Sequence, residues 1–542
     1  MRKLVVIAAT IGVAAAGPVV ALPAPSSAAS SAASTITWGA CPPGTGLQAP
    51  VQCGFLSVPL DYADPDGAKI KIAVSRVRHT SKRYQGVMLV NPGGPGGSGL
   101  GLSTLGSSVP TVGATDVAGQ YDWIGFDPRG VGSSQPALAC NPFYDPAGGN
   151  RPDYIPAPGS KGLPDVWLDL SRGYADACAK NGPILQHMTT IDVARDMDGI
   201  RMALRQQKIN YYGFSYGTYL GQVYATLFPT HVRRMVLDSN VDPRNIWYVA
   251  NLNQDVAFDR NIDIWFAWIA TYDSVYHLGK TEQAVRSLFY GIERDLATNP
   301  AKGAVQVNGQ SVNVLIGPDE WVDDFLTVGY SQQSWPQLGS ALAGYVHKHD
   351  VNTLADLYYG SDAPGNDNGF AVYLGVQCTD VQWPLSLARW NRDNRRIYQT
   401  HPFETWGNAW FNAPCLYWPA RAHKPLTIKG NRLGILLIDE TLDAATPFEG
   451  SEYVRSIFRG ASLLAEPGGT THAGSLSGNT CVDGTVAAYL LSGTLPPRQR
   501  SAPWDMTCAP LPVPVPTASG RPAAAAPPRV RPLIPGRLLA GH

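Results

Sequence analysis

Short runs of apolar residues alternate along this chain with segments that have helical periodicity. The runs that predict buried strands are residues 69–77, 86–90, 123–126, 209–212, 235–237, 433–438 and 462–465. Between them, apolar positions from Ile191 to Leu204 follow the spacing of an amphipathic helix. Alternating strands and helices predict an α/β fold with a mostly parallel central sheet that is covered on both faces.

The interval from about residue 249 to residue 424 breaks this rhythm. It is rich in Trp, Tyr and Asp, has mainly helical patterns, and contains a Gly/Asp/Asn loop at residues 360–369. We interpret it as a cap domain that is inserted after the strand ending at Asp238. The core is then divided into residues 34–248 and 425–508.

The composition at both ends of the chain predicts segments that lie outside this core. A basic pair, an apolar run and small residues within residues 1–33 are typical of a secretory signal peptide. Gly17 and Pro18 interrupt the apolar run, which argues against a transmembrane anchor. Residues 509–542 are dominated by Pro, Ala and Arg and predict a flexible tail. We expect a secreted, extracellular monomer with no membrane association after signal removal.

Composition limits the partners and the compartment. Among the 542 residues, 42 Lys and Arg balance 42 Asp and Glu. Nucleic-acid binding needs clustered excess cation, so we expect no such partner. Eight cysteines fit an oxidising compartment, and neither a C-x-x-C motif nor a His/Cys cluster predicts a metal site. Economical loop closure favours the pairs Cys41–Cys53, Cys140–Cys178, Cys378–Cys415 and Cys481–Cys508.

The strongest chemical signal is G-x-S-x-G at residues 213–217. It follows a predicted strand and precedes a helical run, which is the context of a nucleophile elbow. The flanking glycines let the helix pass close to the strand, and the strained turn lifts the Ser215 hydroxyl clear of the sheet. The bare pattern also arises by chance as a structural turn, but this context favours catalysis.

A serine nucleophile needs a base that is oriented by a carboxylate. In this arrangement the acid follows the serine along the chain. Asp443 lies in a loop past the strand at residues 433–438, where it can reach a base. Asp439 and Glu440 are closer to the sheet edge and are the alternatives.

The base must follow the acid, and that order leaves two histidines. His472 lies on a glycine-flanked loop after the next predicted strand, whereas His542 ends the tail. Loops at the ends of strands are the usual place for catalytic side chains. We therefore predict Ser215, Asp443 and His472 as a catalytic triad.

An oxyanion site needs two preorganised N–H donors. The first candidate is the Tyr216 amide, directly after the nucleophile. The second is Gly94, with Gly93 next, in the loop Asn91 to Gly99. The spacing of the glycines in this loop does not match a phosphate-binding motif.

The motifs recur in the order of one known family: Cys53-Gly54 with Val58 to Tyr62, the loop Asn91 to Gly99, Asp127 to Ser134, Gly213 to Gly217, Val236-Leu237-Asp238, Asp443 to Pro447 and the loop of His472. Over about residues 38 to 508 the chain resembles the secreted tripeptidyl aminopeptidases. These are relatives of the prolyl aminopeptidases in the α/β-hydrolase superfamily. The resemblance implies an α/β-hydrolase fold with a helical cap, and it implies the same triad. It further implies a serine exopeptidase that releases short peptides, expected to be tripeptides, from peptide or protein N-termini. No metal or organic cofactor is implied.

An aminopeptidase must bind the substrate's ammonium group, for which a carboxylate in the cap is the economical choice. Prolyl aminopeptidases use a cap glutamate in a Trp-rich helix, but the comparable segment here, Trp265 to Ile269, has none. Asp380 is our candidate, with Asp259 and Asp263 behind it. Arg129 either lines the substrate site or forms a structural ion pair. A secreted esterase or lipase with the same triad is the alternative function, and a non-enzymatic binding protein on a hydrolase scaffold is a third.

Overall fold

The computed structural model describes residues 35–141, 165–307, 310–359 and 367–516. The predicted signal peptide, the tail beyond residue 516 and residues 360–366 of the predicted loop lie outside the described residues. None of the described helices combines the length and the apolar character needed to cross a bilayer.

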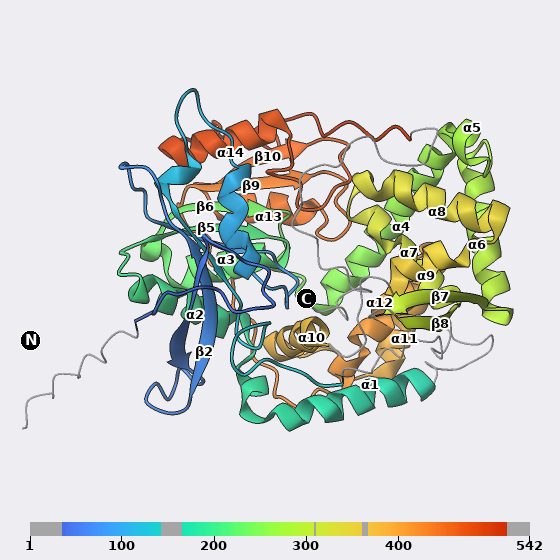
Figure 1. The fold of residues 1–542 in the computed structure, drawn as a ribbon, viewed down its shortest axis with the longest axis horizontal. Coiled ribbons are helices and arrows are strands. Elements are labelled where there is room, and N and C mark those ends of the chain that lie inside the picture. The colour runs from blue at the N-terminus through green and yellow to red at the C-terminus, as the bar shows by residue number, and fades with distance from the viewer. Residues whose placement is uncertain (1–34, 142–164, 308–309, 360–366, 517–542) are drawn as a thin grey trace, which may run out of the picture. The chain divides into compact units, whose positions relative to one another are not determined.

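A single large sheet forms the centre of the described structure (Figure 1). Its strand order is β1-β2-β4-β3-β5-β6-β9-β10-β11. The pairs β1–β2 and β2–β4 are antiparallel, and all other neighbours run parallel. All predicted strands are present, and β1 and β11 are additional. The strands are β1 (Gln52–Pro59), β2 (Lys69–Val77), β3 (Val87–Asn91), β4 (Asp122–Phe126), β5 (Ile209–Phe214), β6 (Val232–Asp238), β9 (Ile435–Glu440), β10 (Ser462–Glu466) and β11 (Met506–Thr507).

Apolar side chains cover both faces of the sheet, because successive residues of a strand point to opposite sides. Leu89 and Tyr211 belong to the cluster that contains α2, α3 and α13, whereas Val90 and Tyr212 belong to the cluster that contains α14. The prediction of a sheet covered on both faces is confirmed. The helices outside the insertion are α1 (Asp165–Cys178), α2 (Thr190–Ala203), α3 (Tyr216–Leu227), α13 (Glu449–Ile457) and α14 (Thr480–Ser492).

A long insertion separates β6 from β9, although these two strands are neighbours in the sheet. It is mainly helical, as predicted, but it also contains an antiparallel hairpin of β7 and β8, which was not predicted. Its elements are α4 (Tyr248–Thr271), α5 (Asp273–Tyr276), α6 (Glu282–Thr298), β7 (Ala301–Val307), β8 (Gln310–Ile316), α7 (Pro318–Phe325), α8 (Trp335–Lys348), α9 (Val351–Tyr359), α10 (Asn368–Asp380), α11 (Leu387–Tyr398) and α12 (Thr405–Asn412).

The insertion packs in two parts. Helices α4 to α9 and the hairpin surround an apolar cluster of their own, which includes Trp265, Trp321 and Trp335. They lie together on the right of Figure 1. In contrast, side chains of α10, α11 and α12, such as Phe370 and Trp410, belong to the apolar cluster that the sheet forms with α2, α3 and α13. The boundary of a separate cap domain at residues 249–424 therefore stays a prediction, since its last helices pack with the core.

The start of the predicted tail is held against the protein. Asn479 Nδ2 donates to the carbonyl of Ala509 at 2.9 Å, Gln332 Nε2 to that of Leu511 at 2.8 Å, and Trp268 Nε1 to that of Pro514 at 3.0 Å. Trp268 lies on α4, so this segment links the edge of the sheet to the insertion. The first residues of the predicted tail are therefore hydrogen-bonded to the folded protein, and the tail's bounds stay a prediction.

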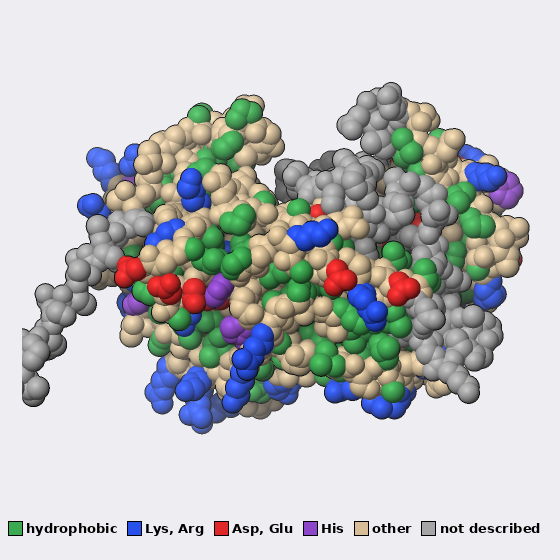
Figure 2. Space-filling view, turned by 90° about the horizontal axis from the view of Figure 1, so that it is seen from below, with side chains coloured by type: hydrophobic (Ala, Val, Ile, Leu, Met, Phe, Trp, Pro, Cys, Tyr) green, Lys and Arg blue, Asp and Glu red, His purple; other side chains and the backbone are tan. Residues whose placement is uncertain are grey.

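The four predicted disulfides, Cys41–Cys53, Cys140–Cys178, Cys378–Cys415 and Cys481–Cys508, are confirmed. Such bonds persist in oxidising compartments. The face in Figure 2 carries side chains of both charges, with Lys and Arg gathered along its lower margin and Asp and Glu nearer its middle.

Candidate active site

Ser215 lies on a sharp turn between β5 and α3. Its backbone has φ 55° and ψ −129°, an unfavourable conformation for a residue with a side chain. The turn is held because Ser215 N donates to Asp238 O at 3.0 Å and Thr218 N donates to Ser215 O at 2.8 Å. A Cβ on Gly217 would lie 2.8 Å from Asn91 O, so a larger residue would push the helix away from β3. These features are those of a nucleophile elbow.

The loops after β9 and β10 bring His472 and Asp443 together. His472 Nδ1 lies 2.7 Å from Asp443 Oδ2, and both side chains are almost fully buried. The backbone amides of Ala445 and Thr446 donate to the other carboxylate oxygen at 2.8 and 3.0 Å. The sequence favours Asp443 over Asp439 and Glu440, and Asp443 is the carboxylate that meets the imidazole.

Asp443 is ionised in this arrangement. Burial opposes its charge, but the electrostatic interaction with His472, the hydrogen bond from its imidazole and the amide of Thr446 hold the Asp443 pKa below its ordinary value. An ionised carboxylate only accepts hydrogen bonds, so Nδ1 of His472 is the donor. Nε2 is then left as the proton acceptor of the neutral ring.

The two alternative carboxylates have structural partners. Asp439 accepts a hydrogen bond from Ser451 Oγ at 2.5 Å, and Glu440 accepts one from Thr471 N at 2.6 Å. Burial raises the pKa of both groups well above the ordinary range, and nearby carboxylates add to the shift. Neither contacts the imidazole of His472 among the described hydrogen bonds.

The loop that carries His472 is fastened to the end of β6. Asp238 accepts hydrogen bonds from Ser475 N at 2.9 Å and from Ser475 Oγ. Ala473 N donates to Ser239 Oγ at 2.8 Å. Burial raises the pKa of Asp238 to about 6, against the opposing effect of the Ser475 hydrogen bonds.

The glycine-rich loop after β3 lies against the nucleophile turn. Gly93 has φ +98°, and a Cβ there would lie 2.6 Å from Phe214 O and 2.9 Å from Ser215 Cβ. Gly94 lines the same cavity as Ser215 and Tyr216. Tyr216 is the first residue of α3, where a helix leaves its amide without an intrahelical acceptor. The loop is therefore placed to offer amides beside Ser215.

Asp127, just past β4, holds this loop in place. Its Oδ1 accepts hydrogen bonds from Ser98 Oγ at 2.6 Å and Gly99 N at 3.0 Å, and its Oδ2 accepts one from Ser133 N at 2.8 Å. The motif that begins at Asp127 thus has a structural role that the sequence did not reveal.

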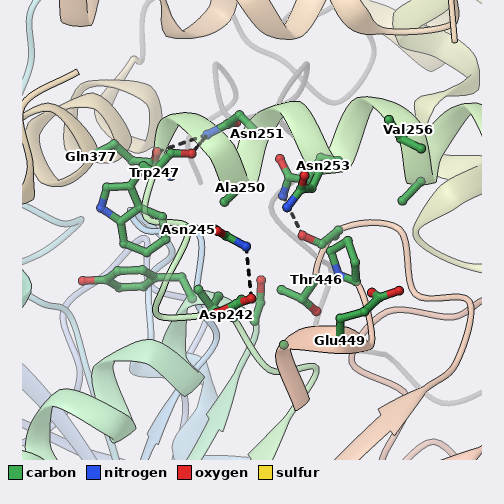
Figure 3. A pocket seen from close by; sticks show the side chains of 18 of the residues that line it. Asp242, Asn245, Trp247, Ala250, Asn251, Asn253, Val256, Gln377, Thr446 and Glu449 are labelled. Carbon is green, nitrogen blue, oxygen red and sulfur yellow. Dashed lines mark hydrogen bonds between the residues drawn. The ribbon is translucent and has the colours of Figure 1, made fainter. Parts of the chain in front are cut away.

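A cavity of about 450 Å³ opens above Ser215, within the usual size range of small-molecule sites. Helix α4 forms one wall, with Ala250 and Asn253 along it, and Thr446 and Glu449 lie across from that helix (Figure 3). Among the described residues, no hydrogen bond joins Ser215 Oγ to His472. Hydrogen bonds between catalytic groups are often long before substrate binds. The complete triad stays a prediction.

Asp380 is not among the residues that line this cavity. Its Oδ1 accepts from Thr190 N at 2.7 Å, and its Oδ2 accepts from Thr190 Oγ1 at 2.6 Å and Trp247 Nε1 at 3.3 Å. Burial raises its pKa to about 7 despite these hydrogen bonds. Asp380 thus joins α10 to the start of α2, and its geometry does not support the predicted ammonium site.

Asp259 and Asp263, the other candidates for the ammonium site, and Arg129 also form hydrogen bonds or ion pairs within the protein. Asp259 accepts a hydrogen bond from Phe403 N at 3.2 Å, and Asp263 forms an ion pair with Arg286. Arg129 is fully buried, and it donates from Nε and a terminal nitrogen to Asp196 at 2.8 and 2.7 Å. Of the two roles expected for Arg129, its contacts fit the structural ion pair.

Two contributions to the site were not predicted from the sequence. Thr446 Oγ1 donates to Asp443 Oδ2 at 3.0 Å and lies 3.4 Å from His472 Nδ1. The carbonyl of Tyr330, in the insertion, accepts a hydrogen bond from His472 N at 2.9 Å. Thr446 could have been found from its place in the acid motif, whereas nothing in the sequence singles out Tyr330.

Comparisons with known proteins agree with this geometry. The family model described as alpha/beta hydrolase fold matches residues 86–337, and the one described as TAP-like protein matches residues 401–502. A tripeptidyl aminopeptidase of Streptomyces coelicolor is 41% identical over 503 residues, which cover 90% of this chain and 88% of that protein. Two proteins of Mycobacterium tuberculosis are more distant. Carboxylesterase B is 32% identical, and the match covers 83% of this chain and 86% of that protein. Serine protease Hip1 is 30% identical, and the match covers 82% of this chain and 86% of that protein.

Proposed function

We propose that this chain, which belongs to the tripeptidyl aminopeptidase family of α/β-hydrolase serine peptidases, releases short peptides from free N-termini. The observation that carries the proposal is the elbow serine in the lining of a cavity that Ala445, Thr446 and Pro447 of the acid loop also line, together with the contact between Asp443 of that loop and His472. The relative from Streptomyces makes tripeptides the expected product.

The arrangement supports an acyl-enzyme mechanism. Nε2 of His472 takes the proton of Ser215 Oγ, and the oxygen attacks the carbonyl carbon of the scissile bond. Amides of Tyr216 and Gly94 hold the oxyanion. Collapse of the intermediate breaks the C–N bond, and His472 returns the proton to the leaving amine. Water, activated by the same imidazole, then releases the peptide and restores the Ser215 hydroxyl.

The substrate's ammonium group needs an anionic partner inside the cavity. Of the two carboxylates that line it, Asp242 already accepts hydrogen bonds from Arg244 at 2.6 Å and Asn245 at 3.0 Å. Glu449 is exposed to the cavity and makes no side-chain hydrogen bond among the described residues, although Arg260 interacts with it electrostatically. We assign the ammonium contact to Glu449 in place of Asp380.

Hydrolysis of a tripeptidyl anilide, compared with its N-acetylated form, tests the function. We expect the free amine to be cleaved far faster, and Glu449→Gln to raise KM for that substrate alone. Ser215→Ala should abolish both reactions. Equal rates on the two anilides, with faster cleavage of short-chain esters, would favour the esterase alternative.

We further propose that the protein is exported. Four disulfides among the described residues support an oxidising destination. Fractionation of expressing cells, with detection of the mature chain in the medium, tests this. Retention in the cytoplasm with free thiols would contradict it.

A further inference from the structure

Helix α4 of the insertion passes directly over the loop that carries Asp443. We propose that α4 positions the catalytic acid, chiefly through Arg260 and Asn261. This inference rests on the proposed function, because it assigns Asp443 to the triad. Both side chains donate to backbone carbonyls of the loop and not to the carboxylate of Asp443, so they are positioning residues.

Two adjacent side chains of α4 converge on one carbonyl. Arg260 donates to Leu442 O at 2.7 Å, and Asn261 Nδ2 donates to the same oxygen at 2.9 Å. Arg260 also reaches Asp443 O at 3.3 Å, and its Nε donates to Asn261 Oδ1 at 3.0 Å. The two side chains therefore hold each other in place and fix the position of Leu442, the residue before the acid. Asn261 is fully buried, so loss of its hydrogen bond would leave a buried polar group unsatisfied.

The far side of the loop is held by the same helix. Gln254, about two turns earlier on α4, donates from Nε2 to Ala445 O at 2.6 Å. Ala444 and Ala445 are buried in the apolar cluster of the insertion, together with Phe258 and Trp265 of α4. The loop is thus clamped before and after Asp443 by one rigid element.

The insertion also holds the base. His472 N donates to Tyr330 O at 2.9 Å, and the Tyr330 ring stands edge-on to the imidazole with centroids 5.6 Å apart. Phe258 of α4 packs against Tyr330 at 5.1 Å between centroids. Because α4 contacts the acid loop directly and the loop of His472 through Tyr330, displacement of this helix would separate His472 from Asp443. The insertion is part of the catalytic scaffold as well as a wall of the substrate cavity.

Variants of Arg260 and Asn261 test this role with two readouts. The first is kcat and KM on the tripeptidyl anilide. The second is the rate at which a small fluorophosphonate modifies Ser215, normalised to folded protein, because this probe depends on the triad and needs no peptide subsite. The variants are Arg260→Met, Arg260→Lys and Asn261→Ala. Arg286→Met is the matched control, since Arg286 pairs with Asp263 of α4 away from the acid loop.

We expect Asn261→Ala to lower kcat and the modification rate together, by on the order of 10- to 100-fold, with KM near the wild-type value. Arg260→Met should lower both rates to a similar extent and should also change KM, because Arg260 lines the cavity and interacts with Glu449. Arg260→Lys should recover part of the loss, and Arg286→Met should behave as wild type. If Arg260→Met does not fold, Asn261→Ala carries the test. A normal modification rate in folded variants, or an increase in KM alone, would overturn the proposal. Failure of the wild-type enzyme to be modified at Ser215 would instead overturn the proposed function.

Discussion

The carbonyl oxygen of Asp238 accepts a 3.0 Å hydrogen bond from the amide of Ser215, while its carboxylate holds the loop of His472 through Ser475. One residue at the end of β6 therefore fixes both the nucleophile turn and the loop of the base. The same edge of the sheet receives the acid loop after β9, because parallel strands end together there.

Removing the carboxylate of Asp238 should loosen the base. Asp238→Ala removes the one oxygen, Oδ2, that accepts both hydrogen bonds from Ser475, so we expect kcat to fall by roughly 10- to 100-fold, as when a catalytic group is displaced by about 1 Å. Ser475→Ala keeps the amide hydrogen bond and should lose much less. Steady-state kinetics of the two variants check this, and equal effects would contradict the role of the amide contact.

A methyl group at Gly93 should damage the oxyanion site. The added Cβ would lie 2.6 Å from Phe214 O and would force the loop away from Ser215. We expect kcat to fall by on the order of 10²- to 10³-fold, the usual cost of losing one oxyanion donor. Gly113→Ala is the control, since that glycine also has a positive φ but an added methyl would meet nothing within 4 Å. Kinetics that do not separate the two variants would argue against the assigned loop.

Asp380 should make stability fall as pH rises. Burial raises its folded-state pKa from 3.8 to about 7, so the native state binds more protons than the unfolded chain between these values. Its contribution to the free energy of unfolding is therefore lost as pH rises through this window, by up to about 4 kcal/mol.

Asp380→Asn cannot titrate, and its stability should decline less than that of the wild type over the same window. Urea unfolding at about pH 4.5 and pH 7.5 measures how the free energy of unfolding changes with pH in the wild type and in the variant. Linkage predicts that the two slopes differ. Parallel slopes for the variant and the wild type would show that Asp380 titrates normally.

The segment at residues 509–516 should stabilise the fold. A chain ending after Cys508 loses the three carbonyls to which Trp268, Gln332 and Asn479 donate. Each of these hydrogen bonds contributes about 1 kcal/mol. A chain ending after Pro516 keeps them. Thermal unfolding should show a lower Tm for the shorter chain, and equal Tm values would mean that these contacts contribute nothing.

Much of the core, and the two loops that carry Asp443 and His472, could be predicted from the sequence. Buried parallel strands appear as short apolar runs, and β2 at Lys69–Val77 has the predicted bounds. Ser215, Asp443 and His472 could be proposed as nucleophile, acid and base because the chemistry requires three residue types in a known order on loops after strands. For Asp443 and His472, the contact of 2.7 Å agrees with that prediction.

Tertiary contacts decide what the sequence could not. Asp380 meets Thr190 and Trp247, residues that are distant in sequence, and their donors occupy the carboxylate that was expected to bind substrate. The hairpin of β7 and β8 did have a signal, since Asn308-Gly309 separates two alternating runs, but the helical context masked it. The packing of α10 to α12 with the core depends on partners that no local pattern specifies.

The most direct test is to identify the residue that a fluorophosphonate modifies and to measure how its rate depends on the base. Peptide mass analysis of the wild type should place the label on Ser215. His472→Ala should slow labelling by several orders of magnitude while leaving the disulfides and the fold intact. Labelling of a different serine, or an unchanged rate at Ser215 in His472→Ala, would contradict a catalytic cluster of Ser215, His472 and Asp443.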